Sequence, residues 1–156
     1  MSTWALARGP NEPPVAYRYN RVGVNILLVS ADPKVREMMS LAVRSVRRGL
    51  GEGERLEFIE AGDGVSGIAL ARRDSPDVVV ADEIASRAGA FALAKDLTGS
   101  LPPYRGRIAI LLDRKQDEWL ARWSGADAWF AKPVNPFELA DIVTGWLTEG
   151  QRKETG

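Results

Sequence analysis

The sequence predicts a doubly wound parallel α/β domain, and two observations predict it. Short apolar runs of the kind that are buried on both faces of a sheet recur along the chain, and segments with a helical spacing of apolar residues separate them. Strands that alternate with helices in this way form a parallel sheet with helices on both faces. The length of 156 residues suits one such domain with a core of its own.

Five apolar runs are the expected strands. They are too apolar for a sheet with one face in water, and glycine, proline and polar turn residues bound them. The runs are VNILLVS at 24–30, RLEFIE at 55–60, VVVAD at 78–82, RIAILLD at 107–113 and a fifth within 127–133.

Five segments that follow these strands are the expected helices. Asp32 is suited to cap the first of them, with Pro33 at its first helical position. The second should turn Val65, Ile68 and Ala69 towards the core, because these apolar residues recur at helical spacing. The segments lie within 33–46, 65–73, 89–97, 116–124 and 135–147.

The composition excludes several classes of function. Lysine plus arginine equal aspartate plus glutamate at 21 each, so the chain lacks the basic excess of a nucleic-acid binder. The chain has no histidine, which excludes histidine bases, histidine metal ligands and a phosphohistidine donor role. It also has no cysteine, which excludes thiol chemistry and fits a cytoplasmic protein. No apolar run approaches the roughly 20 residues that span a bilayer, so no membrane contact is expected.

Three regions are expected along the chain. Three prolines predict a flexible N-terminal arm over residues 1–22, the domain itself spans 23–149, and 150–156 form a polar C-terminal tail. Because so few residues follow the domain, we expect it to stand alone, without a DNA-binding output domain.

The carboxyl ends of the strands are where a sheet of this kind binds its ligands. If the strand order is 2-1-3-4-5, Asp82 after the third strand and Lys132 after the fifth border the same pocket. The residues that end or follow the strands at this edge are Ser30, Ala31, Asp32, Asp82, Glu83, Leu112, Asp113 and Lys132.

Several stretches in the right order resemble the response-regulator receiver family. EAGDG at 60–64, PDVVVAD at 76–82 and GADAWFAKPVNPFEL at 125–139 carry the resemblance, which covers residues 24–148. The resemblance implies a flavodoxin-like fold with strand order 2-1-3-4-5 and a cis peptide before Pro133. It also implies a role in two-component, or phosphorelay, signal transduction rather than an enzymatic activity.

Receivers transfer a phosphoryl group to an aspartate with the help of Mg²⁺, which two acidic residues after the first strand help to hold. The resemblance makes Asp82 the phosphoacceptor candidate and Lys132 the candidate contact to the phosphoryl oxygens. Ser30 and Ala31 occupy the positions of the acidic pair, so this edge is expected to have lost its metal site. An ion pair between Asp82 and Lys132 that closes the pocket is the simpler interpretation of those two residues.

We therefore expect no cofactor. The alternative is a magnesium site rebuilt from Asp32, Glu83 or Asp113. Asp32 better serves as a helix cap, and Glu83 should face away from its neighbour, because adjacent strand residues point to opposite faces. At the fourth strand the family has a serine or threonine, and here Leu112 or Asp113 takes that position without the hydroxyl.

Three tryptophans predict an interaction surface. Trp119 and Trp123 lie four residues apart on a helix too short to bury both, and exposed aromatic residues of this size mark partner surfaces. Trp129 lies at the aromatic position of the fifth strand, and receivers commonly use this region for dimerisation or output. The expected partner is a histidine kinase, a downstream signalling protein or a second copy of the chain.

Three functions remain, two of them for a receiver and the third from another class. The first is an atypical receiver that signals mainly through protein contacts, and the second is a receiver phosphorylated on Asp82 by a histidine kinase despite the missing acidic pair. The third, a nucleotide- or flavin-binding domain or small enzyme, is disfavoured because SADPKVRE at 30–37 stands where a glycine-rich loop would follow the first strand.

Overall fold

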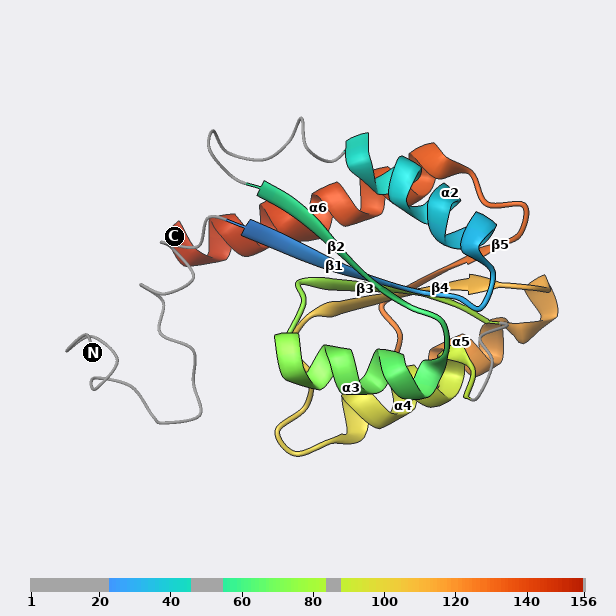
Figure 1. Ribbon diagram of the computed structural model, residues 1–156. Coiled ribbons are helices and arrows are strands. Elements are labelled where there is room, and N and C mark those ends of the chain that lie inside the picture. The colour runs from blue at the N-terminus through green and yellow to red at the C-terminus, as the bar shows by residue number, and fades with distance from the viewer. Residues whose placement is uncertain (1–22, 46–54, 84–87, 156) are drawn as a thin grey trace.

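A computed structural model describes residues 23–45, 55–83 and 88–155, with side chains up to residue 148. The described residues form one five-stranded parallel sheet and five α-helices (Figure 1), as the apolar pattern predicts. The strand order is β2-β1-β3-β4-β5, which confirms the predicted flavodoxin-like topology. The predicted arm over residues 1–22 lies outside the described residues.

The sheet is built from short strands in parallel register. β3 is central and pairs with β1 on one side and β4 on the other, so that Val80 lies opposite both Leu28 and Ala109. The strands are β1 (Gly23–Val29), β2 (Arg55–Ala61), β3 (Val78–Asp82), β4 (Arg107–Leu112) and β5 (Ala128–Ala131).

The helices cover both faces of the sheet. α2 and α6 pack on one face, and α3, α4 and α5 pack on the other (Figure 1). The bounds are α2 (Pro33–Arg44), α3 (Gly64–Asp74), α4 (Ala90–Gly99), α5 (Glu118–Ser124) and α6 (Pro136–Thr155), and a 3-10 turn, η3 (Lys115–Asp117), precedes α5. The helical backbone of α6 thus continues through residues that the sequence assigns to a polar tail.

Side-chain caps fix where α2, α3 and α6 begin, and Asp63 supplies the one on α3. The carboxylate of Asp32 accepts a hydrogen bond of 2.9 Å from the backbone N–H of Lys34 at the start of α2. The side-chain oxygen of Asn135 accepts one of 2.9 Å from the N–H of Phe137 at the start of α6. These caps satisfy backbone donors that the first helical turn leaves without a partner, and the one at Asp32 confirms the sequence prediction.

The core consists of two layers separated by the sheet. Successive residues of the central strands alternate between them: Leu27 and Val79 face α3, α4 and α5, whereas Ile26 and Val80 face α2 and α6. All four side chains are fully buried. Burial on both faces explains why these strands read as continuous apolar runs.

The orientation of α3 differs from the prediction. Val65 is 50% exposed and Ala69 is exposed, so only Ile68 of the three residues expected to face inward packs against the core. The helix is rotated because a stripe of small residues allows it to approach the sheet and α4 closely. The buried residues of this stripe are Gly64, Gly67 and Ala71.

Candidate functional site

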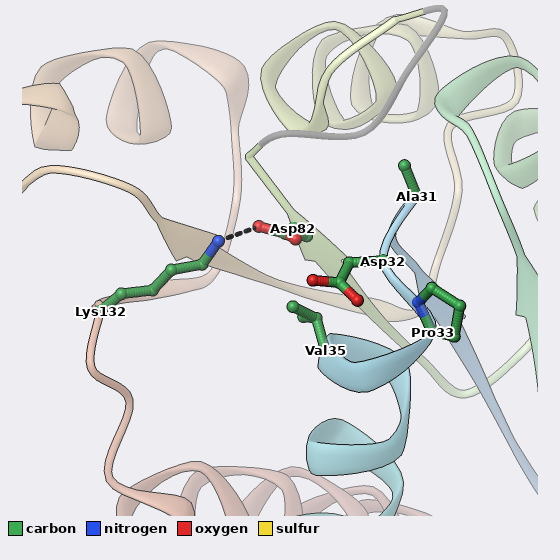
Figure 2. Close-up of a pocket in the computed structure, with 6 residues that line it drawn as sticks. All are labelled: Ala31, Asp32, Pro33, Val35, Asp82 and Lys132. Atoms are coloured by element: carbon green, nitrogen blue, oxygen red, sulfur yellow. Dashed lines mark hydrogen bonds and ion pairs between the residues drawn. The ribbon is translucent and has the colours of Figure 1, made fainter.

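The carboxyl edge of the sheet holds an open pocket of about 440 Å³. It lies between the ends of β1 and β3, the start of α2 and the segment after β5. Figure 2 shows the residues that line it, which are Ala31, Asp32, Pro33, Val35, Asp82 and Lys132. The strand order thus brings Asp82 and Lys132 to one pocket, although 50 residues separate them in the sequence.

Asp82 is held from two sides. Its side chain is 3% exposed, and its Oδ1 lies 2.6 Å from the Nζ of Lys132, which reaches in from the far side of the pocket (Figure 2). Its Oδ2 accepts a hydrogen bond of 2.8 Å from the Oγ of Ser30. The Lys132-Pro133 peptide is cis, as the resemblance implies. The ion pair expected between Asp82 and Lys132 is therefore present, and Ser30 adds a second partner.

Ser30 is part of the framework of the site. It is fully buried, and its Oγ accepts a hydrogen bond of 3.1 Å from the backbone N–H of Asp32 while donating to Asp82. Its carbonyl accepts a hydrogen bond of 2.5 Å from Arg36, whose guanidinium also binds Glu60 at 2.8 Å. The sequence indicates only that Ser30 stands where the receiver family has an acidic residue. It does not predict the hydrogen bond to Asp82, because the two residues are 52 positions apart and no local pattern signals the contact.

The remaining acids near the pocket have other partners. Asp113, at the end of β4, lies 3.8 Å from the Nζ of Lys132. Glu83 is turned towards β4, where its carboxyl group accepts a hydrogen bond from the backbone N–H of Asp113. Leu112 is fully buried, so neither residue at the predicted serine or threonine position supplies a hydroxyl group.

A pair of carboxyl groups lies behind this edge. Burial raises the pKa of Glu83, and Asp117 raises it further through a hydrogen bond and charge repulsion, while the N–H of Asp113 acts in the opposite direction. The pKa of Asp117 is lowered, chiefly by the hydrogen bond from Glu83 and also by Arg114, which lies 3.2 Å away. Of the two carboxyl groups, Glu83 is therefore the one whose protonated form the folded protein favours.

Mg²⁺ prefers an octahedral shell of oxygen ligands that includes carboxylates, and the pocket lining holds two carboxylates, those of Asp32 and Asp82. The positions of the predicted acidic pair carry a hydroxyl group that donates to Asp82 and the methyl group of Ala31. The Asp32 carboxylate caps α2. Within the part of the chain that the structure describes, no three acidic, histidine or cysteine side chains gather as a metal ion would require.

The three tryptophans lie in different environments. Trp119 and Trp123 on α5 are 63% and 53% exposed, as the shortness of that helix predicts. Trp129 on β5 is partly buried against the core, and the guanidinium of Arg122 lies 5.6 Å from its ring centroid. The exposed pair therefore faces solvent from α5, whereas Trp129 packs behind it.

A doubly wound sheet that presents an aspartate and a lysine together at its carboxyl edge has the architecture of the receiver class. No family model matches the chain. An uncharacterized response regulatory protein of Mycobacterium tuberculosis is 34% identical over 95 residues, which make up 59% of this chain and 68% of that protein. The chain belongs to the response-regulator receiver family, whose members are the receiver domains of two-component signalling.

Longer relatives match over part of their length. The probable transcriptional regulatory protein TcrX of Mycobacterium tuberculosis is 30% identical over 120 residues, which cover 77% of this chain and 47% of that protein. This chain thus spans about half the length of that relative. None of the described helices is both long and apolar enough to cross a membrane.

Solved structures share the fold. The chemotaxis response regulator CheY4 of Vibrio cholerae superposes with a TM-score of 0.65 at 22% identity, over 79% of this chain and 98% of that one. The receiver domain of a Pseudomonas aeruginosa sensor histidine kinase, PA1611, superposes with a TM-score of 0.68 at 20% identity, over 81% of this chain and 98% of that one. That domain was solved with a magnesium ion coordinated in its active site cleft.

Proposed function

We propose that this receiver is atypical: it signals mainly through contacts with other proteins, and phosphoryl transfer to Asp82 is slow or absent. The observation that carries the proposal is the state of the Asp82 carboxylate. One of its oxygens pairs with Lys132 at 2.6 Å and the other accepts the hydroxyl proton of Ser30 at 2.8 Å. Both oxygens of the nucleophile are engaged before any phosphodonor arrives.

The charges at the site support the same proposal. A metal-dependent receiver gathers several carboxylates, and their excess negative charge attracts Mg²⁺, which then offsets the charge of the transferring phosphoryl group. Here Lys132 pairs with Asp82 and also lies 3.8 Å from Asp113, while a neutral hydroxyl and a methyl group replace the acidic pair. The site therefore offers less attraction for a divalent cation and leaves the dianionic phosphoryl group facing a carboxylate with one ammonium group to offset it.

The protein contacts are proposed to involve the exposed tryptophans of α5. Trp119 and Trp123 together present a large aromatic area to solvent, and tryptophan is the residue most enriched at the energetic centres of interfaces. The proposed partner is a signalling protein such as a kinase or a downstream effector. No catalytic turnover is part of this proposal.

Treatment with acetyl phosphate and Mg²⁺ tests the proposal, with the product resolved on a phosphate-affinity gel. We expect no shifted band under conditions in which a magnesium-dependent receiver, run in parallel, is fully modified. A stoichiometric band that disappears in Asp82→Asn would contradict the proposal.

A second candidate is a receiver that a histidine kinase phosphorylates on Asp82 without the acidic pair. The observation that favours it is the open pocket beside Asp82, with the Lys132 ammonium group 2.6 Å from the carboxylate that would accept the phosphoryl group. A stoichiometric, Asp82-dependent band in the same gel would select this candidate.

A further inference from the structure

The exposed face of α5 carries cations beside its tryptophans. The Nζ of Lys95, on the neighbouring helix α4, lies 4.7 Å from the ring centroid of Trp123 and 3.5 Å from its backbone oxygen. Arg122 lies between Trp119 and Trp123 in the sequence and is exposed. We call Lys95, Trp119, Arg122 and Trp123 the tryptophan–cation surface.

Asp96 and Asp117, two of the acidic groups near this surface, are engaged elsewhere, whereas Glu118 of α5 lies directly before Trp119 and is half-buried. Asp96 on α4 pairs with Arg72 of α3 at 2.5 Å, and Asp117 is 7% exposed and pairs with Arg114. Within the described residues, no carboxylate lies within ion-pair distance of Lys95 or Arg122. The surface therefore presents two aromatic rings together with two cations that no ion pair among the described residues neutralises.

We propose that the tryptophan–cation surface binds a protein segment in which acidic residues flank an apolar side chain. The apolar side chain would pack on the rings of Trp119 and Trp123, and the carboxylates would pair with Lys95 and Arg122. Because such pairs complement the charge of the surface, they favour this partner over neutral or basic segments. The inference rests on the proposed function and names the chemistry of the partner.

A second copy of the chain fits this surface less well. In a two-fold symmetric dimer the same patch meets itself, so Lys95 and Arg122 would face their own counterparts. Like charges brought together across an interface are costly. Single-stranded nucleic acid also stacks on aromatic residues, but it requires a cationic groove that follows many phosphates. The chain as a whole has no basic excess, with 21 lysine plus arginine against 21 aspartate plus glutamate.

The test uses the full chain and three synthetic peptides. The first places glutamates around leucine and phenylalanine, the second replaces every glutamate by lysine, and the third replaces the apolar residues by alanine. Binding is followed by NMR through the tryptophan indole N–H signals, assigned with single Trp→Phe variants. We expect the acidic apolar peptide alone to shift the signals of Trp119 and Trp123, with an affinity that falls as salt is raised.

Matched variants define the site. Trp123→Ala and Lys95→Glu should each weaken binding of the acidic apolar peptide by about tenfold or more. Phe137→Ala removes another exposed aromatic side chain, which is 77% exposed on α6, and Arg55→Glu reverses a charge on β2. Both controls should bind the peptide as the native chain does. All four variants should keep the native thermal midpoint, because the altered side chains are exposed.

Several outcomes would overturn the inference. They are no shift with the acidic apolar peptide at millimolar concentration, equal shifts with the lysine peptide, and tighter binding of a single-stranded RNA oligonucleotide at the same indole signals. A dimer in analytical ultracentrifugation that Trp123→Ala dissociates would also overturn it, in favour of a second copy. The peptide titration reports on α5, whereas the phosphate-affinity gel reports on Asp82, so the inference and the proposed function can fail separately.

Discussion

Ser30 places a neutral hydroxyl group at the position where the receiver family has a charged carboxylate. It donates to Asp82 and accepts from the N–H of Asp32, so the hydrogen bonds of the edge are satisfied without a metal ion. Its backbone carbonyl is tied to α2 through Arg36. A carboxylate at this position would instead face Asp82 as a like charge, and a cation would then be needed to stabilise the pair.

Restoring the acidic pair is therefore expected to create a metal site. Ser30→Asp with Ala31→Asp should bind Mn²⁺, used as a paramagnetic substitute for Mg²⁺, at least about tenfold more tightly than the native chain. The thermal midpoint of this variant should also rise with added Mg²⁺, because a ligand that binds only the folded state stabilises it. Electron paramagnetic resonance and thermal melts measure the two effects.

The uncharged pair Ser30→Asn with Ala31→Asn is the control for side-chain size, and it should respond to neither metal. Native protein that binds Mn²⁺ as tightly as the diaspartate variant would show that Asp32, Glu83 or Asp113 already supplies a metal site.

The carboxyl pair of Glu83 and Asp117 gives a second expectation at the residue scale. The pKa of Glu83 is raised, first by burial, so the folded state holds this proton more tightly than the unfolded state does. The stability that the raised pKa contributes is fully present below the pKa that Glu83 has in the unfolded chain. It is lost as the pH rises through the pKa that Glu83 has in the folded protein. The lowered pKa of Asp117 has the opposite effect on stability. The stability that it contributes is lost as the pH falls through the pKa that Asp117 has in the folded protein.

Glu83→Gln is therefore expected to stabilise the protein at neutral pH by about 1 kcal/mol. The amide still accepts from the N–H of Asp113 and donates to Asp117, but it carries no charge to bury. The gain should vanish near pH 4, about the ordinary carboxyl pKa, where Glu83 is protonated in any case. Urea unfolding at the two pH values measures this, and Glu57→Gln, at an exposed position on β2, is the control. An equal change at both pH values would contradict a raised pKa of Glu83.

At the scale of the elements, α3 shows how small residues set the position of a helix. A Cβ atom on Gly67 would lie 2.9 Å from Leu93 Cδ1 and 3.0 Å from Val29 Cγ2. The glycine therefore allows close packing of α3 against both α4 and the central sheet. The same packing turns Val65 outward, contrary to the sequence prediction.

Gly67→Ala is expected to destabilise the domain by about 1–3 kcal/mol, because an added methyl group in a packed layer forces its neighbours to move. Gly145→Ala on α6 is the matched control, because a Cβ atom there would meet no atom within 4 Å. In that open position alanine should stabilise the helix by about 0.5–1 kcal/mol. Urea unfolding measures the change in the free energy of unfolding of both variants. An unchanged free energy of unfolding in Gly67→Ala would mean that α3 can shift without cost.

At the scale of the whole molecule, two regions with different proposed roles lie at different places around the sheet. Its carboxyl edge places Asp82, Ser30 and Lys132 in one pocket, while the face covered by α3, α4 and α5 presents the exposed tryptophans. In the proposed function, protein contacts at the second region carry the signal. In this proposal no phosphoryl group shifts the conformational equilibrium of the receiver. A partner that binds one conformation more tightly than another would shift it instead.

The sequence by itself determined the fold class, the five strands and the residues at their ends, because the alternation of buried strands with helices is a local pattern. It also predicted the helix cap at Asp32 and that one short helix does not bury both Trp119 and Trp123, since both features depend on residues a few positions apart. Only the tertiary structure decided that Ser30 donates to Asp82, that the pKa of Glu83 is raised by burial and by Asp117, and that α3 turns Val65 to solvent. Those outcomes depend on residues far apart in the sequence, as Ser30 and Asp82 are at 52 residues, and no periodicity along the chain encodes them.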